Sequence, residues 1–452
     1  MVGTQTVMGG RGMWRAAADM AVDAGTFALC CFAATAFGSN EPWAMGLIAA
    51  ASGVLLACRL IPMIWSGERP ATPWSAYPPL LLFCAFAGAQ ALFWRRGLPE
   101  AGLWSIHTVE RHSTVLYLML AVSYAAAAFL VQNGFGSRRR LRLLWLGVIA
   151  LGAFEAVYGL VQYMGDYDFI WHFEKASYRG MATGTFVNRN HYALFMNLAL
   201  CAGAGFLFYR AKRMQGPGDL SLRGVVKHPD SAKLLWFGIV LALMGLAVVF
   251  STSRMGIAAM LGASGAMLVA VRSLEAGRRG VLAGLLVLAA IVGLALYMGL
   301  EPVIERFQSI EMSMDYDRMP LWRDAWPMAA RHFLFGQGLG SFQWTYPAYE
   351  TVAPDIPARY AHNDYLQAVA ETGVAGLALL LWAAAALWRT ALRNLRSASP
   401  FVGGIGLASI GAMTAIAMQE ITDFGLYIPG VAVMAAVLAG LNLRAAGEAP
   451  PR

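Results

Sequence analysis

Residues 234–250 read LLWFGIVLALMGLAVVF, a run of seventeen residues without a charge or a strongly polar group. A helix needs about 20 mostly apolar residues to cross the ~30 Å hydrocarbon core of a bilayer, and this run is close to that length. It ends at Ser251-Thr-Ser-Arg254, after which a second apolar run, 256–272, begins almost at once. The stretch therefore predicts two membrane-spanning helices joined by a very short turn.

Apolar runs of this kind recur along the whole chain of 452 residues, which is 58% hydrophobic and 13% charged. An average soluble domain carries roughly a quarter charged residues, so the composition excludes a soluble enzyme, a secreted disulfide scaffold and a disordered chain. Lipid offers no partner to unpaired backbone groups, and no barrel-like alternation is visible, so each run is expected to be a helix. The sequence predicts an all-α polytopic membrane protein, a single integral membrane domain over 1–452, with about twelve spans: 21–38, 43–64, 77–94, 114–132, 143–164, 190–209, 234–250, 256–272, 281–299, 364–388, 401–418 and 428–444.

The distribution of basic residues predicts the sidedness of these spans. With both termini in the cytoplasm, the cytoplasmic segments hold 22 of the 34 lysines and arginines, and the external segments hold 18 of the 26 acids. An excess of Lys and Arg marks cytoplasmic loops. The sequence pI near 9.3 then reflects the excess of positive charge in the cytoplasmic segments, and it gives no support to nucleic-acid binding.

The long connections are external in this arrangement, and the longest is 300–363. We expect 300–363 to form a large periplasmic loop with short amphipathic helices. Within it, residues 320–334 place apolar side chains at roughly helical spacing, together with Trp322 and Trp326. Tryptophan favours the membrane–water interface, so this segment is predicted to be an amphipathic helix in contact with membrane lipids.

The pattern with the clearest chemistry is His362-Asn-Asp-Tyr-Leu-Gln367, which opens the tenth predicted span and is followed by Glu371-Thr-Gly373. Histidine is the side chain best suited to accept a proton near neutral pH, so His362 is a candidate general base. The alternative is a histidine that forms only local hydrogen bonds beside Asn363 at a helix N-terminus. The residues alone leave both interpretations open.

Two further patterns lie on the same external side. Residues 184–191, Gly-Thr-Phe-Val-Asn-Arg-Asn-His, predict a tight turn into a helix N-terminus, whose free N–H groups together with Arg189 can bind an anion. Ser251-Thr-Ser-Arg254-Met-Gly256 is the whole connection between two spans, so Arg254 either reaches lipid headgroups or contacts a ligand.

Other motifs are interpreted as structural. Asp166-Tyr-Asp168 and Asp315-Tyr-Asp317 each spell an acidic triplet with which enzymes that use nucleotide sugars hold a divalent metal. Both triplets are external in the predicted topology, where nucleotide sugars are absent, so no metal site is predicted. Residues 336–340, Gly-Gln-Gly-Leu-Gly, lack the preceding strand of a dinucleotide loop and are expected to be a flexible turn.

Taken together, these motifs resemble the superfamily of O-antigen ligases and O-antigen polymerases, which transfer lipid-linked glycans in the bacterial envelope. The similarity covers about residues 150–380. Family members often carry an arginine three residues before the first motif, where this chain has Met181 and the nearest upstream arginine is Arg179. The segments that carry the resemblance are 184–190, 251–256, Arg318…Leu321-Trp322…Ala325, 335–342 and 362–373.

The resemblance implies an enzyme of the bacterial inner membrane with its active site on the periplasmic face. It implies transfer of O-antigen polysaccharide from undecaprenyl diphosphate to a sugar hydroxyl of lipid A–core, by a metal-independent, inverting glycosyltransferase that needs no cofactor. Arginines would hold the diphosphate in place of a metal ion. The implied catalytic residues are His362 and Arg254, the implied diphosphate-binding residues are Arg189, Arg254, Arg318 and Arg179, and the implied supporting residues are Asn188, Asn190, Asn363 and Glu371.

Several functions remain open, with the ligase favoured. An O-antigen polymerase or a protein O-oligosaccharyltransferase would use the same kind of donor and differ in the acceptor. A flippase for lipids or glycans belongs to a different class and would require charged or broken helices at mid-membrane in repeat-related positions. Only Glu155 is clearly buried within a predicted span, and the two halves show no matching pattern, which favours transfer over transport.

Overall fold

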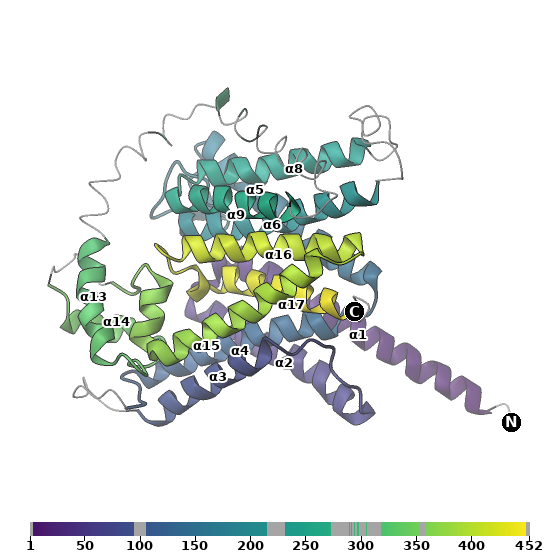
Figure 1. Ribbon diagram of the computed structural model, residues 1–452, viewed down its shortest axis with the longest axis horizontal. Coiled ribbons are helices and arrows are strands. Elements are labelled where there is room, and N and C mark those ends of the chain that lie inside the picture. Colours follow the sequence, from purple (N-terminus) through teal and green to yellow (C-terminus); the bar gives the residue numbers. More distant parts are fainter. Residues whose placement is uncertain are drawn as a thin grey trace.

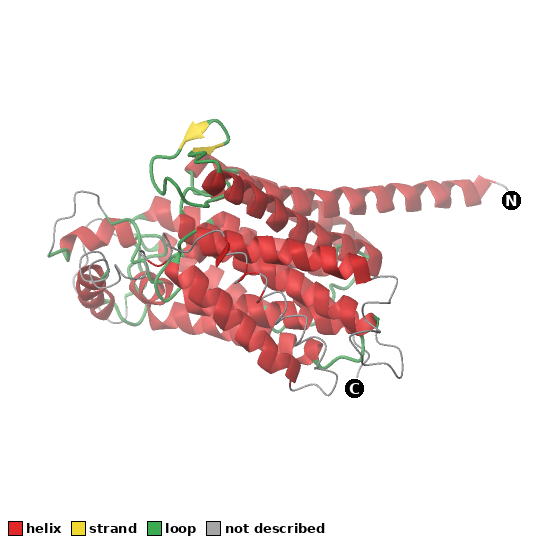
Figure 2. Cartoon of the chain, turned by 90° about the horizontal axis from the view of Figure 1, so that it is seen from above, coloured by secondary structure: helices red, strands yellow, loops and turns green. Residues whose placement is uncertain are grey.

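The computed structural model describes residues 3–94, 105–214, 231–272, 318–351 and 358–448, together with a few isolated positions between 289 and 304. In these ranges nearly all regular structure is helical (Figures 1 and 2). The short elements are η1 Phe37–Ser39, β1 Phe169–Ile170, β2 Phe173–Glu174, α13 Met319–Arg331, α14 Phe342–Thr345, η2 Tyr346–Ala348 and η3 Gly425–Tyr427.

Ten helices in the described ranges are long and apolar enough to cross a membrane. Helix α3, Tyr77–Leu92, is apolar as well but has 16 residues, which gives about 24 Å of helix. The prediction of an all-α polytopic membrane protein is therefore confirmed, and the ninth predicted span, 281–299, lies almost wholly outside the described residues. The ten helices are α1 Gly3–Thr35, α2 Pro42–Ser66, α4 Arg111–Asn133, α5 Arg138–Met164, α6 Arg189–Arg213, α8 Ser231–Phe250, α9 Arg254–Arg272, α15 Asp364–Leu395, α16 Pro400–Gln419 and α17 Pro429–Gly447.

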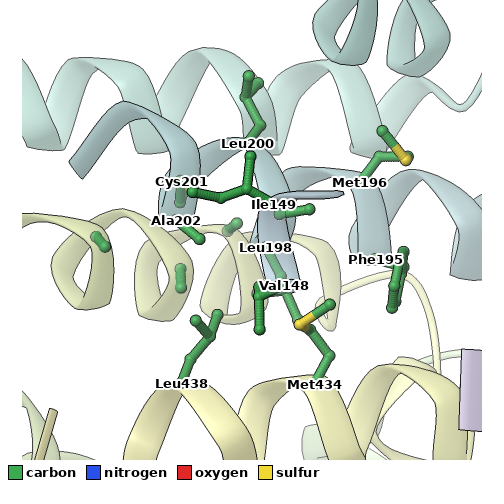
Figure 3. Close-up of a cluster of buried hydrophobic side chains, with 14 of the residues drawn as sticks. Val148, Ile149, Phe195, Met196, Leu198, Leu200, Cys201, Ala202, Met434 and Leu438 are labelled. Atoms are coloured by element: carbon green, nitrogen blue, oxygen red, sulfur yellow. The ribbon is translucent and has the colours of Figure 1, made fainter. Parts of the chain in front are cut away.

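Helix α6 forms the centre of the bundle, with nearly every side chain along its apolar stretch buried. It packs against α5, α8, α9 and α16, and Figure 3 shows its apolar residues meeting those of α5 and α17. Glycines allow the closest contact, because a Cβ added to Gly205 of α6 would lie 2.4 Å from the carbonyl oxygen of Gly404 in α16. Small residues bring helices together in membranes, so α6 and α16 form a tightly joined pair.

The two ends of the bundle differ. Both chain termini lie toward one end, whereas α13 and α14 lie at the opposite end, on the left of Figure 1. Helix α13 runs across the spans there rather than along them, as a comparison of the two views shows. This end, called the loop end below, carries the first turns of α6, α9 and α15.

Helix α15 is interrupted at Gly373, which has φ 64° and ψ −176°. The backbone of residues 333–334 fills the interruption: Val374 N–H donates to the Phe333 carbonyl at 2.8 Å, and Ala375 N–H donates to the Leu334 carbonyl at 3.2 Å. A Cβ at position 373 would lie 2.2 Å from the Leu334 oxygen, so only glycine fits. The segment before α14 is thereby joined to the helix.

Candidate functional site

The first turn of α6 brings together two of the motifs singled out in the sequence. Asn188 caps the helix by accepting a hydrogen bond from the Asn190 N–H at 2.8 Å. Arg189 Nη1 donates to Thr252 Oγ1 at 2.8 Å, and Ser253 Oγ donates to Asn190 Oδ1 at 2.8 Å. The turn that contains Thr252 and Ser253 leads directly into α9, so it places Arg254 at the start of that helix, beside the start of α6.

Arg189 is buried, with only 7% of the residue exposed, and its guanidinium is contacted from several sides. Its guanidinium lies 5.3 Å from the centre of the Tyr178 ring, and Nη1 is 3.1 Å from the sulfur of Met181. The Met181 sulfur also faces Thr252 Oγ1 at 3.4 Å. A buried guanidinium in such a frame is fixed in orientation.

Arg179 is placed differently. Its Nη2 pairs with Glu174 at 2.6 Å, its Nε donates to the Lys175 carbonyl at 3.0 Å, and 58% of its side chain is exposed. The structure therefore ties Arg179 to the segment that follows the β1–β2 hairpin and does not join it to the Arg189–Thr252 pair.

His362 precedes the N-terminus of α15. Asn363 caps that helix, since its side chain accepts the Leu366 N–H at 2.9 Å. His362 itself has φ +49°, a left-handed conformation that is uncommon for a residue with a side chain and costs on the order of 1–3 kcal/mol. Its ring stands edge-on to Phe424, with 4.7 Å between ring centres. Phe424 belongs to the loop between α16 and α17, so the segment before α15 meets that loop here.

Sequence reasoning missed Asp423, the residue before Phe424. It is 1% exposed, and within the described part of the chain neither of its carboxylate oxygens accepts a hydrogen bond. Burial by itself would raise the pKa of Asp423, but the positive charges of His191, His362 and Arg318 hold it below its usual value. Three groups that are far apart in sequence therefore converge on one carboxylate.

The loop that carries Asp423 is fixed by two other buried carboxyls, Asp364 and Glu420. The Asp364 N–H donates to the Glu420 carbonyl at 3.0 Å, while the Glu420 side chain accepts the Gly425 N–H at 2.7 Å. Asp364 Oδ2 accepts the Leu426 N–H at 3.3 Å. Burial, Asp364 and Asp423 together raise the pKa of Glu420 well above its ordinary value. The pKa values of Glu420 and Asp423 are thus shifted in opposite directions, and Asp423 is the more acidic of the two.

Glu371 connects α15 to the glycine-rich segment 336–340. Its carboxylate accepts the Gly340 N–H at 2.7 Å, the Phe342 N–H at 3.2 Å and the Tyr427 hydroxyl at 2.6 Å. The three glycines of the segment all have positive φ, and the segment is buried. The predicted flexible turn is thus a buried, hydrogen-bonded loop, because its free N–H groups find an acceptor on another element.

The residues of the candidate site form two groups joined by α6. The first contains Arg189, the turn before α9 and Arg254; the second contains His362, Asp423 and Arg318. Consecutive residues of α6 reach both, since Arg189 and Asn190 contact the turn before α9 and His191 lies 3.7 Å from Asp423. Both groups belong to the loop end of the bundle.

The acidic triplets do not join either group in the described residues. Asp168 accepts the Gly180 N–H at 2.8 Å and so closes its own loop, and the second triplet, 315–317, lies outside the described residues. Within the residues that the structure describes, no three His, Cys, Asp or Glu side chains come together in the way that a metal site requires.

Residues 239–381 match the family model of the O-antigen ligases. This segment is a domain of the O-antigen ligase type. The matched segment contains Arg254, Arg318, His362 and Glu371, and it makes the protein a multi-pass membrane glycosyltransferase of the O-antigen ligase or polymerase type. No curated protein matches the chain. Arg189, His191 and Asp423 lie outside the matched segment, and the structure brings them to it.

Proposed function

We propose that the protein is an O-antigen ligase: it transfers O-antigen polysaccharide from undecaprenyl diphosphate to a sugar hydroxyl of lipid A–core. The reaction takes place on the periplasmic face of the inner membrane, where the loop end of the bundle lies, with both termini in the cytoplasm. The match of residues 239–381 to the O-antigen ligase family model, together with the motifs in and around that segment, supports this assignment.

The donor enters from the bilayer, and its diphosphate is the leaving group. Arg189 and Arg254 are the first residues of α6 and α9, whose starts are joined by the Arg189–Thr252 and Asn190–Ser253 hydrogen bonds. Helix N-termini also favour negative charge. We assign the diphosphate to this pair, with Arg318 as a third cation near the reacting carbon. Guanidinium groups bind phosphates in a bidentate manner and can neutralise the charge that develops as the phosphate departs.

His362 is the general base in this proposal. The acceptor hydroxyl oxygen bonds to the anomeric carbon from the face opposite the diphosphate, the bond from that carbon to the phosphate oxygen breaks, and the hydroxyl proton moves to His362. The product has inverted configuration, and no metal or cofactor takes part. Asp423 stabilises the imidazolium that forms, as a buried carboxylate does beside a catalytic histidine.

The observation that carries the proposal is the contact of His362 with Phe424, directly beside Asp423, whose carboxylate is buried without hydrogen-bond partners in the described residues and lies in the field of His362 and Arg318. Most buried polar groups are hydrogen-bonded, and exceptions concentrate at functional sites. A charged cluster at one end of the bundle suits a transfer reaction with lipid-linked substrates.

The test is the lipopolysaccharide of a strain that lacks the gene, analysed on a gel. Loss of all long chains with an intact core supports a ligase, whereas core carrying one repeat indicates a polymerase, and unchanged long chains contradict both. Restoring the gene with His362→Ala should leave transfer at least 10²-fold below the wild type, because general-base catalysis contributes about 10²–10⁴-fold. The exposed His172 provides the control, since His172→Ala should restore the long chains fully.

A further inference from the structure

His191 is the point at which the two groups of the candidate site meet. It is the third residue of α6, directly after Arg189 and Asn190, which contact the turn before α9. His191 Nε2 lies 3.7 Å from Asp423 Oδ1, and the two side chains are 5% and 1% exposed. The separation is that of an ion pair and is longer than a hydrogen bond.

The neighbouring Phe424 shows that His191 and His362 approach the same place. The ring of Phe424 is edge-on to His191 with 4.6 Å between centres, and edge-on to His362 with 4.7 Å between centres. Asp423, the next residue in the chain, is therefore faced by one histidine from α6 and one from the segment before α15. In its protonated form, each of these histidines lowers the pKa of the Asp423 carboxyl.

Polar atoms in this arrangement are buried without partners. Nε2 of His191 and both carboxylate oxygens of Asp423 have no hydrogen bond to any described residue. A burial of this kind costs free energy that ordinary structural histidines avoid by pairing. These contacts therefore favour an electrostatic interaction of His191 with Asp423 over a role in packing alone.

We propose that His191 is a positioning residue of the transfer reaction, which shares Asp423 with His362 and determines how much of that single negative charge is available to the base. The inference rests on the proposed role of His362. It assigns to His191 no contact with the donor or the acceptor.

The proton balance gives the consequence. When the proton of the acceptor hydroxyl moves to His362, a positive charge forms beside Asp423, and a neutral His191 leaves the carboxylate to stabilise it. A protonated His191 pairs with Asp423 and repels the second positive charge. Transfer therefore requires both histidines to be neutral beforehand, in a field set by the other groups around Asp423, which are Arg318, Asp364 and Glu420.

Two substitutions separate position from charge. His191→Gln keeps an N–H that can face Asp423 but cannot titrate, whereas His191→Leu removes both. In purified protein we expect His191→Leu to lower kcat about 10- to 100-fold, because neighbouring residues of one charged network are energetically coupled to about that extent, with the KM for undecaprenyl-diphosphate-linked donor within twofold of wild type. His191→Gln should keep most of kcat at neutral pH. His172→Gln, an exposed histidine at the same end, is the control.

The pH profile provides the readout that a purely structural role would not change. For the wild type, log(kcat/KM) on the acid side should approach a slope of about 2, because transfer requires that both histidines beside Asp423 be deprotonated, and His191→Gln should reduce it to about 1. A His191→Gln profile that superimposes on the wild type, or a loss in His191→Leu that appears in the donor KM alone, overturns the inference. Absence of any transfer by the wild type would instead overturn the proposed function.

Discussion

Arg179 lies in the loop before α6, and Arg189, ten residues later, is the first residue of that helix; the surroundings of the two side chains differ completely. Arg189 is buried against Tyr178 and donates to Thr252, whereas Arg179 pairs with Glu174 in the solvent. Exposed ion pairs contribute about 0–1 kcal/mol, so the pairing of Arg179 has little consequence for stability. The guanidinium of Arg189, in contrast, already has the fixed orientation that binding of a phosphate requires.

This difference gives a prediction for single residues. Arg189→Lys should lower kcat/KM for the lipid-linked donor about tenfold and Arg189→Ala about 10²-fold, since lysine keeps the charge but not the planar fork. Arg179→Ala should stay within about threefold of the wild type, because its side chain is exposed. Kinetics at varied donor concentration would measure this, and equal losses in Arg179→Ala and Arg189→Ala would contradict the assignment.

The sequence identified Arg189, Arg254 and His362 as candidates because each stands in a motif at the start of an apolar run. It did not identify Asp423, and the reason is physical. Asp423 lies in an ordinary polar break between two apolar runs, where a solvated acid is the common case. Its importance comes from contacts with segments about 60 and 230 residues earlier in the chain, which no local pattern records.

At the scale of elements, Glu371 is the junction of three of them. It joins the first part of α15 to the loop before α14 and to Tyr427 of η3. Charge-assisted hydrogen bonds to backbone N–H groups are stronger than neutral ones, and a partly satisfied buried network is costly. We therefore expect Glu371 to affect the assembly of the loop end more than the chemistry.

Glu371→Gln should destabilise the protein by about 1–3 kcal/mol, because an amide cannot accept from all of these donors with the same strength. The expected result is a lower melting temperature in detergent and a lower yield of folded protein, with a smaller change in the specific activity of what remains. Glu174→Gln, at an exposed position of the same end, should leave the melting temperature unchanged. A large loss of specific activity at an unchanged melting temperature would indicate a direct catalytic role for Glu371.

Run length and apolar content were sufficient to predict the spanning helices, and capping residues such as Asn188 and Asn363 mark two of their beginnings. The interruption of α15 could not be predicted in this way. Gly373 lies within a single predicted span, 364–388, and what opens the helix there is the backbone of residues 333–334, about 40 positions away. The small β1–β2 hairpin was missed as well, since four strand residues leave almost no pattern.

At the scale of the whole molecule, the two ends of the bundle have opposite characters. The candidate site, α13 and α14 occupy one end, and both termini lie toward the other (Figures 1 and 2). The basic residues Arg210, Lys212 and Arg213 close α6 at the end opposite its site-bearing first turn. Arginine and lysine concentrate on the cytoplasmic side, so the site is expected outside.

A fused reporter that is active only in the periplasm tests this arrangement. Fusion at Ser341, before α14, should give an active reporter, whereas fusion after Met214 or after Gly447 should give an inactive one. Three described elements, α8, α9 and α13, separate the two fusion sites, which are expected at opposite ends of the bundle, so each fusion serves as a control for the other. The reverse pattern would place the candidate site in the cytoplasm and remove the basis for an external acceptor.

The interruption of α15 also has a consequence for how the protein is made. The residues that fill it, Phe333 and Leu334, precede Gly373 in the chain and leave the ribosome first. When α15 enters the bilayer, the carbonyl groups that receive the Val374 and Ala375 N–H groups have already been synthesised. We therefore expect α15 to insert into the membrane without a late rearrangement. Shortening the segment 318–351 should remove these acceptors and prevent the correct insertion of α15.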